Sequence, residues 1–351
     1  MSDTEFLSAG EEPSESALLV ESEGIAVEPI TQWDLFWTRL RRHRLAMIAS
    51  GVLALLVLVV VSAPVLQAAG WIDSPVERLV DEGGRTLRNI PPRLSDGTVQ
   101  ILPPGAEAHP ASTSALWFGS DDLGRGVFSR VIYGGRASLI VGFVTGMIVA
   151  LFGTVMGSIA GYYPGAVDQS LMRFTDLVLG LPLLPVAIVV GRILPELTFL
   201  PGWIKQGPMG IALLLGFLSW GGLARIVRAE FLSLREKEFV EAARAAGASD
   251  RRIVFRHALP NAMSPIIVQT TLIVGIAIVI EAALSFLGFG VPPPTPTWGA
   301  MAAEGGRLAV RGFWWELVFS GFALVTTVLS INFLGDGLRD ALDPTQTIER
   351  K

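Results

Sequence analysis

Long runs of apolar residues alternate with short polar segments along most of this chain. Six of the runs reach the length of about 20 residues that a helix needs to cross a bilayer. Pro182 and Pro185 interrupt the third run, and Arg225 and Arg228 blur the end of the fourth. The pattern predicts an all-α polytopic membrane protein with six transmembrane helices, near residues 45–66, 136–161, 170–193, 208–228, 262–289 and 313–337.

The composition fits this class of protein. The 351 residues are 51% apolar with a mean hydropathy of +0.52, which is more apolar than an ordinary soluble domain. Cys is absent, which excludes disulfides and thiolate metal sites. Residues 1–38 hold nine Asp and Glu but no Lys or Arg, so the rest of the chain is mildly basic. We expect an acidic, disordered tail over 1–32, which lacks the basic start of a signal peptide.

The distribution of Lys and Arg predicts the orientation in the membrane. With a cytoplasmic N-terminus, the inner segments hold sixteen Lys and Arg, whereas the two short outer loops hold four. Because inner loops are enriched in positive charge, both termini are expected in the cytoplasm. This orientation divides the chain into the tail 1–32, a first segment and helix 33–66, an outer loop 67–135, a core 136–340 and a cytoplasmic tail 341–351.

A polar, arginine-rich segment separates the fourth and fifth predicted helices. We call this segment, residues 229–261, the elbow. Ser233 and Glu236 match a capping box that would open a short helix, and Gly247 suits the left-handed residue that ends one. Ser249 would cap a second helix, which Pro260 would close. The elbow is either a solvated link between two helices or a docking site for a soluble partner.

The second predicted helix carries glycines four residues apart. Small residues at this spacing let helix backbones approach closely in lipid. We expect the stripe to lie at helix contacts within the bundle or at a subunit contact, and it consists of Gly142, Gly146, Gly153, Gly157 and Gly161.

Ionisable residues inside predicted helices are candidates for function, because burying a charge in lipid is costly. Glu281 either lines a polar translocation path or hydrogen-bonds a neighbouring helix or partner subunit. Asp176 stands three residues after Arg173, which favours an ion pair within one helix. The outer segment 117–130 mixes aromatic and charged residues, and is either a structural collar on the membrane surface or a substrate-facing element.

Several functions are poorly supported by the sequence. None of the three lysines lies in a phosphate-binding loop, so ATP hydrolysis by that route is excluded. The three histidines form no H-E-x-x-H site, no G-x-S-x-G motif is present, and no helix carries an arginine ladder. A hydrolase or a voltage-gated channel is therefore disfavoured, and we expect no cofactor, no catalytic residue, no metal site and no nucleic-acid partner.

The elbow resembles the EAA motif of permease subunits in bacterial ABC importers, through Glu241-Ala242-Ala243, Gly247 and Leu259-Pro260. Further motifs resemble the C-type permeases of the dipeptide/oligopeptide/nickel branch. These motifs are Gly119–Arg125, Glu281–Val291, Pro293–Met301 and Leu334–Pro344, together with the arginine-flanked first helix. The likeness spans residues 33–345. The chain departs from the usual pattern at Ser120, Gly126, Ala258 and Ser320, which weakens the transfer of detailed roles there.

The resemblance implies a type I ABC importer permease with six transmembrane helices and a long outer loop. Implied partners are a homologous B-type permease, two cytoplasmic ABC ATPase subunits, an extracytoplasmic solute-binding protein and membrane lipid, in a bacterial inner membrane. Di- or oligopeptides are the first substrate class, with nickel chelates or other small solutes as alternatives. A channel or scaffold that recruits another soluble protein is the alternative outside the importers. The implied ATPase-coupling residues are Glu241, Ala242, Ala243, Gly247, Arg252, Leu259 and Pro260, while Glu281, Asp176 and Trp298 are candidates for the pathway or a subunit contact.

Overall fold

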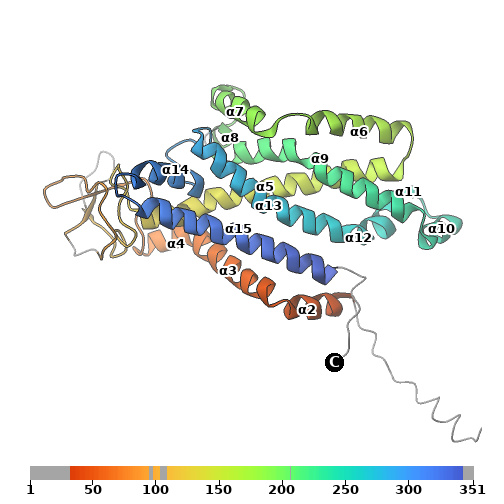
Figure 1. Ribbon diagram of the computed structural model, residues 1–351, viewed down its shortest axis with the longest axis horizontal. Helices are drawn as coiled ribbons and strands as arrows, with labels where there is room; N and C mark the ends of the chain where they lie inside the picture. Colours follow the sequence, from red (N-terminus) through yellow and green to blue (C-terminus); the bar gives the residue numbers. More distant parts are fainter. Residues whose placement is uncertain (1–31, 95–97, 103–108, 206, 343–351) are drawn as a thin grey trace, which may run out of the picture.

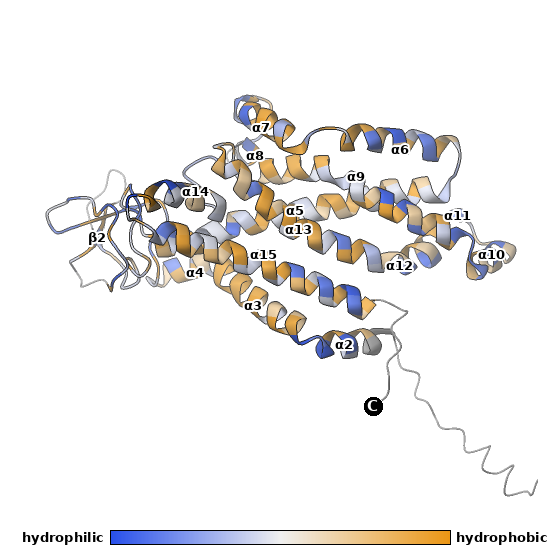
Figure 2. Ribbon diagram, viewed as in Figure 1, coloured by the Kyte–Doolittle hydropathy of each residue, from blue (hydrophilic) through white to orange (hydrophobic). Residues whose placement is uncertain are grey.

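The computed structural model describes residues 32–94, 98–102, 109–205 and 207–342. Over these residues the chain is an elongated helical bundle (Figure 1). The middles of its long helices are apolar and polar residues gather near their ends, as Figure 2 shows. The predicted all-α polytopic class is confirmed. Five helices are long and apolar enough to cross a bilayer: α3 (Arg44–Val61), α5 (Val127–Tyr162), α9 (Pro208–Arg235), α13 (Met263–Phe286) and α15 (Trp315–Leu342).

The third predicted span is a broken helix. It consists of α6 (Ala166–Leu179) and α7 (Leu183–Ile193), which are bent by 76° to one another. The break lies between Gly180, which caps α6, and Pro182, which precedes α7. Pro185 falls in the first turn of α7, where a missing N–H costs no intrahelical hydrogen bond. If the pair is counted as one span, the described residues contain six candidate spans, the number that the sequence predicts.

Two predicted boundaries were wrong by about two turns. Helix α5 begins at Val127 rather than 136, because its first turns are buried by other parts of the protein instead of lying in lipid. Helix α9 continues to Arg235 rather than ending at 228, because Val227, Phe231 and Leu234 bury an apolar stripe beyond the basic residues.

The described residues that follow the first span form a small folded unit, which we call the loop domain (residues 70–94, 98–102 and 109–126). It follows the short helix α4 (Ala63–Ala68) and contains an antiparallel sheet in the order β1-β2-β3. Leu79 pairs with Ile101, and both are buried with Leu116 in a small apolar core. The three strands are β1 (Arg78–Val80), β2 (Gln100–Leu102) and β3 (His109–Pro110).

Short helices mark the two ends of the bundle in Figure 1. The loop domain and α14 (Trp298–Ala309) lie at one end, the loop-domain end. Helix α2 (Gln32–Arg42) and the helices of the elbow lie toward the other, the elbow end. The predicted tails lie outside the described residues except Gln32 and the last residues of α15, Ala341 and Leu342. The other short elements are η1 (Leu194–Glu196), α8 (Gly202–Lys205), α10 (Glu238–Ala245), α11 (Asp250–Arg252), the π-helical turn η2 (Ile253–Ala258) and α12 (Leu259–Asn261).

The glycine stripe of α5 lies at contacts with α9 and α13 of the same chain. A β-carbon on Gly157 would stand 2.5 Å from the carbonyl oxygen of Ala224, and one on Gly161 would stand 2.6 Å from Cβ of Phe231. Gly153 also meets α9, while Gly142 and Gly146 meet Ile278 and Val274 of α13. The absent side chains therefore let α5 approach both neighbours closely.

Candidate functional site

The elbow is an ordered helical turn fixed to the end of α9. Val240 and Ile253 are fully buried and Ala258 nearly so, in a cluster with Phe231 and Leu234 of α9. Each fully buried aliphatic side chain contributes about 1.5–3 kcal/mol of transfer free energy. These buried contacts hold the elbow against the end of α9.

The turn between α10 and α11 requires a glycine. Gly247 has a φ of +80°, which is costly for a residue with a β-carbon. Its N–H donates to the carbonyl of Arg244, and the N–H of Ala248 donates to that of Ala243 at 3.0 Å. These bonds satisfy carbonyls at the end of α10, as in a Schellman-type cap. The left-handed conformation predicted for Gly247 is confirmed.

Another local expectation for the elbow was wrong. Ser233 does not open a helix, because it lies inside α9; α10 begins at Glu238 after the extended Lys237. The second helix runs through α11, η2 and α12 and ends at Asn261, one residue after Pro260, close to the predicted end. The wider π-helical turn just before Pro260 gives the proline ring the room that a regular α-helix lacks.

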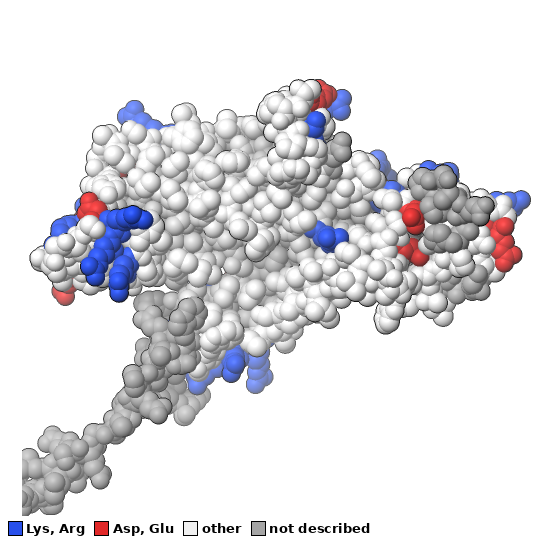
Figure 3. All heavy atoms as spheres, turned by 180° about the vertical axis from the view of Figure 1, so that it is seen from behind, with Lys and Arg blue, Asp and Glu red and all other residues white. Residues whose placement is uncertain are grey.

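The outward surface of the elbow combines aromatic and charged groups. Phe255 is 63% exposed and Phe239 is 40% exposed. Basic side chains gather at this end of the molecule (Figure 3). The predicted coupling residues Glu241, Ala242, Gly247, Arg252 and Pro260 are exposed there too, whereas Ala243 and Leu259 are half-buried.

A hydrogen bond ties the elbow to α5. The hydroxyl of Tyr162, the last residue of α5, donates to Oδ1 of Asp250 at 2.7 Å. Tyr162 is only 5% exposed. Both residues line a depression of about 390 Å³ together with Glu241 and Arg244. The elbow is thus attached to α5 as well as to α9 and α13.

Asp176 pairs with a different arginine from the one predicted. Nη2 of Arg225, on α9, lies 2.6 Å from Oδ1 of Asp176, so the contact joins two helices. The expected partner, Arg173, lies on the same helix as Asp176. One helical turn away, Arg228 binds both carboxylate oxygens of Asp168 at 2.5 and 2.7 Å. These two pairs fasten α6 to α9.

Glu281 lies near the C-terminal end of α13. It is fully buried, and its carboxylate accepts hydrogen bonds from Ser285 at 2.8 Å and from Ser138 of α5 at 3.3 Å. The Ser138 hydroxyl also accepts the backbone N–H of Trp298 at 3.2 Å. The indole N–H of Trp298 donates to the carbonyl of Val131 at 2.8 Å. Both predicted residues therefore connect α13 and α14 to α5 within this chain.

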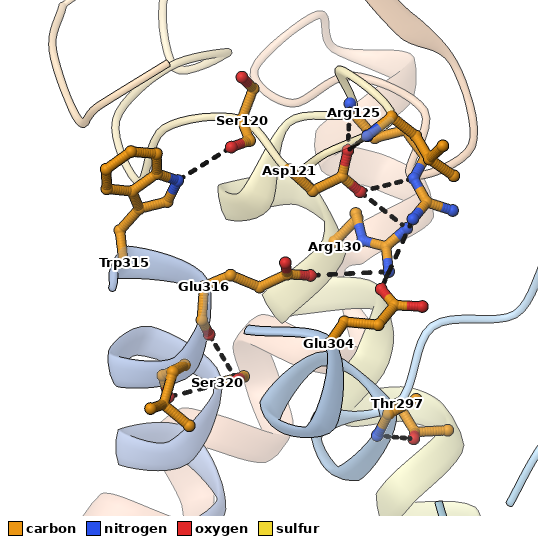
Figure 4. A network of polar contacts seen from close by, with 12 residues as sticks. Ser120, Asp121, Arg125, Arg130, Thr297, Glu304, Trp315, Glu316 and Ser320 are labelled. Atoms are coloured by element: carbon orange, nitrogen blue, oxygen red, sulfur yellow. Dashed lines mark hydrogen bonds and ion pairs between the residues drawn. The ribbon is translucent and has the colours of Figure 1, made fainter. Parts of the chain in front are cut away.

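A buried charge cluster at the loop-domain end was not predicted (Figure 4). Its centre is Arg130 of α5, which is 3% exposed. The guanidinium lies 3.3 Å from Asp121, 3.2 Å from Glu304 and 3.9 Å from Glu316. Arg125 lies 2.6 Å from Asp121 and 3.7 Å from Glu304. The cluster joins the loop domain, α5, α14 and α15.

The segment 117–130 is anchored by this cluster. The indole N–H of Trp315 donates to the carbonyl of Ser120 at 2.9 Å, and the ring of Phe118 stacks on Phe319 with centroids 3.9 Å apart. Gly119, with a φ of +79°, stands where a β-carbon would be 2.5 Å from the carbonyl of Ile90. These contacts pack the segment against α15 and leave open whether it also faces a substrate.

Comparison with known proteins gives consistent matches. The family described as "Binding-protein-dependent transport system inner membrane component" matches residues 153–348, and "N-terminal TM domain of oligopeptide transport permease C" matches residues 31–77. The dipeptide transport system permease protein DppC of Alkalihalophilus pseudofirmus is 37% identical over 92% of both chains. The oligopeptide transport system permease protein OppC of Bacillus subtilis is 33% identical over 92% of this chain and 93% of its own. An inward-facing MetNI methionine ABC transporter chain aligns with a TM-score of 0.49 at 19% identity, over 62% of this chain and 97% of that one.

Proposed function

Because this chain belongs to the family of binding-protein-dependent transport system inner membrane components, we propose that it is the permease subunit of an ATP-driven importer of di- or oligopeptides. The names of its relatives favour peptides over the nickel chelates and other solutes that the sequence left open. The family is one of permeases rather than enzymes, so ATP hydrolysis belongs to separate subunits.

The observation that carries this proposal is the elbow. It is fixed to α9 by buried side chains, continues into α13, and presents Phe255 beside exposed charges. An ABC ATPase subunit that binds this surface would move both helices when it binds and hydrolyses ATP. Two such ATPases would act, one on this chain and one on a homologous B-type permease that forms the pathway with it.

The distribution of positive charge supports a cytoplasmic elbow end. In this orientation α2, the elbow and the C-terminal end of α15 share the inner side of a bacterial inner membrane. An extracytoplasmic solute-binding protein would deliver peptide to the loop-domain end. Exposed apolar side chains such as Leu55 and Leu58 of α3 would contact lipid.

The first test is reconstitution of the complete importer in liposomes. With both permeases, both ATPases and the binding protein, we expect uptake of a labelled dipeptide that requires ATP. Absence of uptake by an assembled complex that hydrolyses ATP would contradict the peptide assignment.

The second test changes the elbow. Glu241→Lys and Gly247→Asp should leave membrane insertion intact but abolish ATP-driven uptake, because the surface charge or the turn is altered. Gly70→Asp is the matched control, since Gly70 also has a positive φ and open space around it but lies at the other end. Normal uptake by both elbow variants at normal expression would reject the coupling role.

A further inference from the structure

A cavity of about 360 Å³ opens between the end of α7, α8, α14 and the connection from α13 to α14. Its size lies within the range of about 300–1,000 Å³ that small-molecule sites occupy. Three cationic side chains and one carboxylate line it: Arg192, Lys205, Arg307 and Glu304. Apolar residues such as Leu194, Ile211 and Val291 complete the wall.

The charges of the cavity are unbalanced. None of the three cations forms an ion pair within the part of the chain that the structure describes. Arg192 and Arg307 are exposed and Lys205 is half-buried, so all three cations are open to a ligand that enters the cavity. An anionic group of that ligand would supply the partner that they lack.

Glu304 belongs both to the cavity and to the buried charge cluster. Arg125 and Arg130 both contact its Oε2, so Oε1 takes part in no ion pair among the described residues. Glu304 therefore offers a fixed negative charge in a cavity that is otherwise positive.

The wall of the cavity is connected to the buried Glu281. Ser285 lines it, and the Ser285 hydroxyl donates to the buried carboxylate of Glu281 at 2.8 Å. A ligand in the cavity would thus contact the outer end of α13, the helix into which the elbow continues. A ligand bound in the cavity would therefore act on α13, the same helix that an ATPase would move through the elbow.

We propose that this cavity is a binding subsite for the charged termini of a small zwitterionic peptide. Arg192, Lys205 and Arg307 bind the C-terminal carboxylate, and Glu304 binds the N-terminal ammonium. The inference rests on the proposed function, since it takes the transported peptide as the ligand. In this proposal the permease itself, and not only the binding protein, selects peptides whose termini are free.

The absence of Cys from this chain allows a labelling test on the complete importer in which the modification of this subunit alone is followed. Ala300→Cys places a single thiol in the cavity wall and leaves all four charged groups in place. Arg311→Cys, an exposed position just beyond α14, is the control. We would measure the rate at which a thiol reagent labels each variant with and without dialanine, after confirming that each variant still takes up peptide.

Dialanine should slow labelling of Ala300→Cys but not of Arg311→Cys, and dialanine amide should protect at least about tenfold more weakly because it lacks the carboxylate. Adding Arg192→Ala or Lys205→Ala should weaken protection by about tenfold. Equal protection by dialanine and its amide, or none by either, would overturn the subsite. If the subsite is overturned but the wild-type importer still takes up peptide with ATP, the proposed function stands. If the wild-type importer takes up no peptide, the proposed function is rejected.

Discussion

Replacing Gly157 with alanine is expected to separate α5 from α9. The new β-carbon would stand 2.5 Å from the carbonyl oxygen of Ala224, 2.7 Å from Cβ of Val227 and 3.1 Å from the backbone nitrogen of Arg228. Two of these atoms are backbone and the third is a β-carbon, so no change of rotamer relieves the overlap. The helices must move apart along the segment where their glycines now allow contact.

The magnitude follows from two opposing effects. Inserting a methyl group into a close-packed contact costs about 1–3 kcal/mol. Alanine also stabilises a helix by up to about 1 kcal/mol relative to glycine. With the full gain in helix propensity, we therefore expect Gly157→Ala to lower the free energy of unfolding by up to about 2 kcal/mol.

Gly222→Ala is the matched control because Gly222 lies on α9 and has open space around it. Only the gain in helix propensity should remain there, so this variant should be as stable as the wild type or more stable. Reversible unfolding of the isolated chain in mixed detergent micelles measures both. The packing argument fails if Gly157→Ala is as stable as Gly222→Ala.

Three further predictions concern the contacts that fasten the bundle. Tyr162→Phe removes the bond to Asp250 at a cost of about 1 kcal/mol, and should reduce uptake more than ATP hydrolysis if α5 follows the elbow; equal reductions would contradict this role. Arg130→Met leaves the buried Glu316 without an ion-pair partner and leaves Asp121 and Glu304 with Arg125 alone; it should cost about 3–5 kcal/mol in unfolding experiments, whereas a loss below about 1 kcal/mol would refute the account of the charge cluster. Arg228→Ala breaks a two-bond, half-buried pair and should be more destabilising than Arg225→Ala, whose exposed pair contributes less than about 1 kcal/mol; the reverse order of melting temperatures would contradict the geometry.

Local sequence signals succeeded where a single residue type determines the conformation. Gly247 was predicted as left-handed because a helix commonly ends in this way, and the turn has that geometry. Ser233 and Glu236 misled because they lie at the end of a helix, in the last turn and at the C-cap of α9, where the backbone N–H groups already donate to carbonyls of that helix. Pro260 marks the end of the second helix to within one residue, and the π-helical turn that precedes it could not be read from the pattern.

The contacts missed from the sequence join residues that lie far apart in it. Arg130 and Glu304 are separated by 174 positions, and Tyr162 and Asp250 by 88. Hydropathy locates the spans because each needs about 20 apolar residues, but it carries no information on which helices become neighbours. The partner of Asp176 illustrates the limit, since the nearest arginine in the sequence is not the one that the fold brings to it.

Helix α5 links the two ends that the proposed mechanism must connect. Its 36 residues span about 54 Å at the α-helical rise. Tyr162 fastens one end to the elbow, and Arg130 fastens the other to the loop domain, α14 and α15. Between these two ends, glycines of α5 bring its backbone into direct contact with α9. Because close-packed interfaces shift between discrete arrangements rather than deform continuously, a displacement of the elbow should reach Arg130 as a movement of the whole helix. Arg130 contacts Glu304, which lines the cavity at the loop-domain end. A movement of α5 driven by ATP would therefore shift Glu304 and change the cavity.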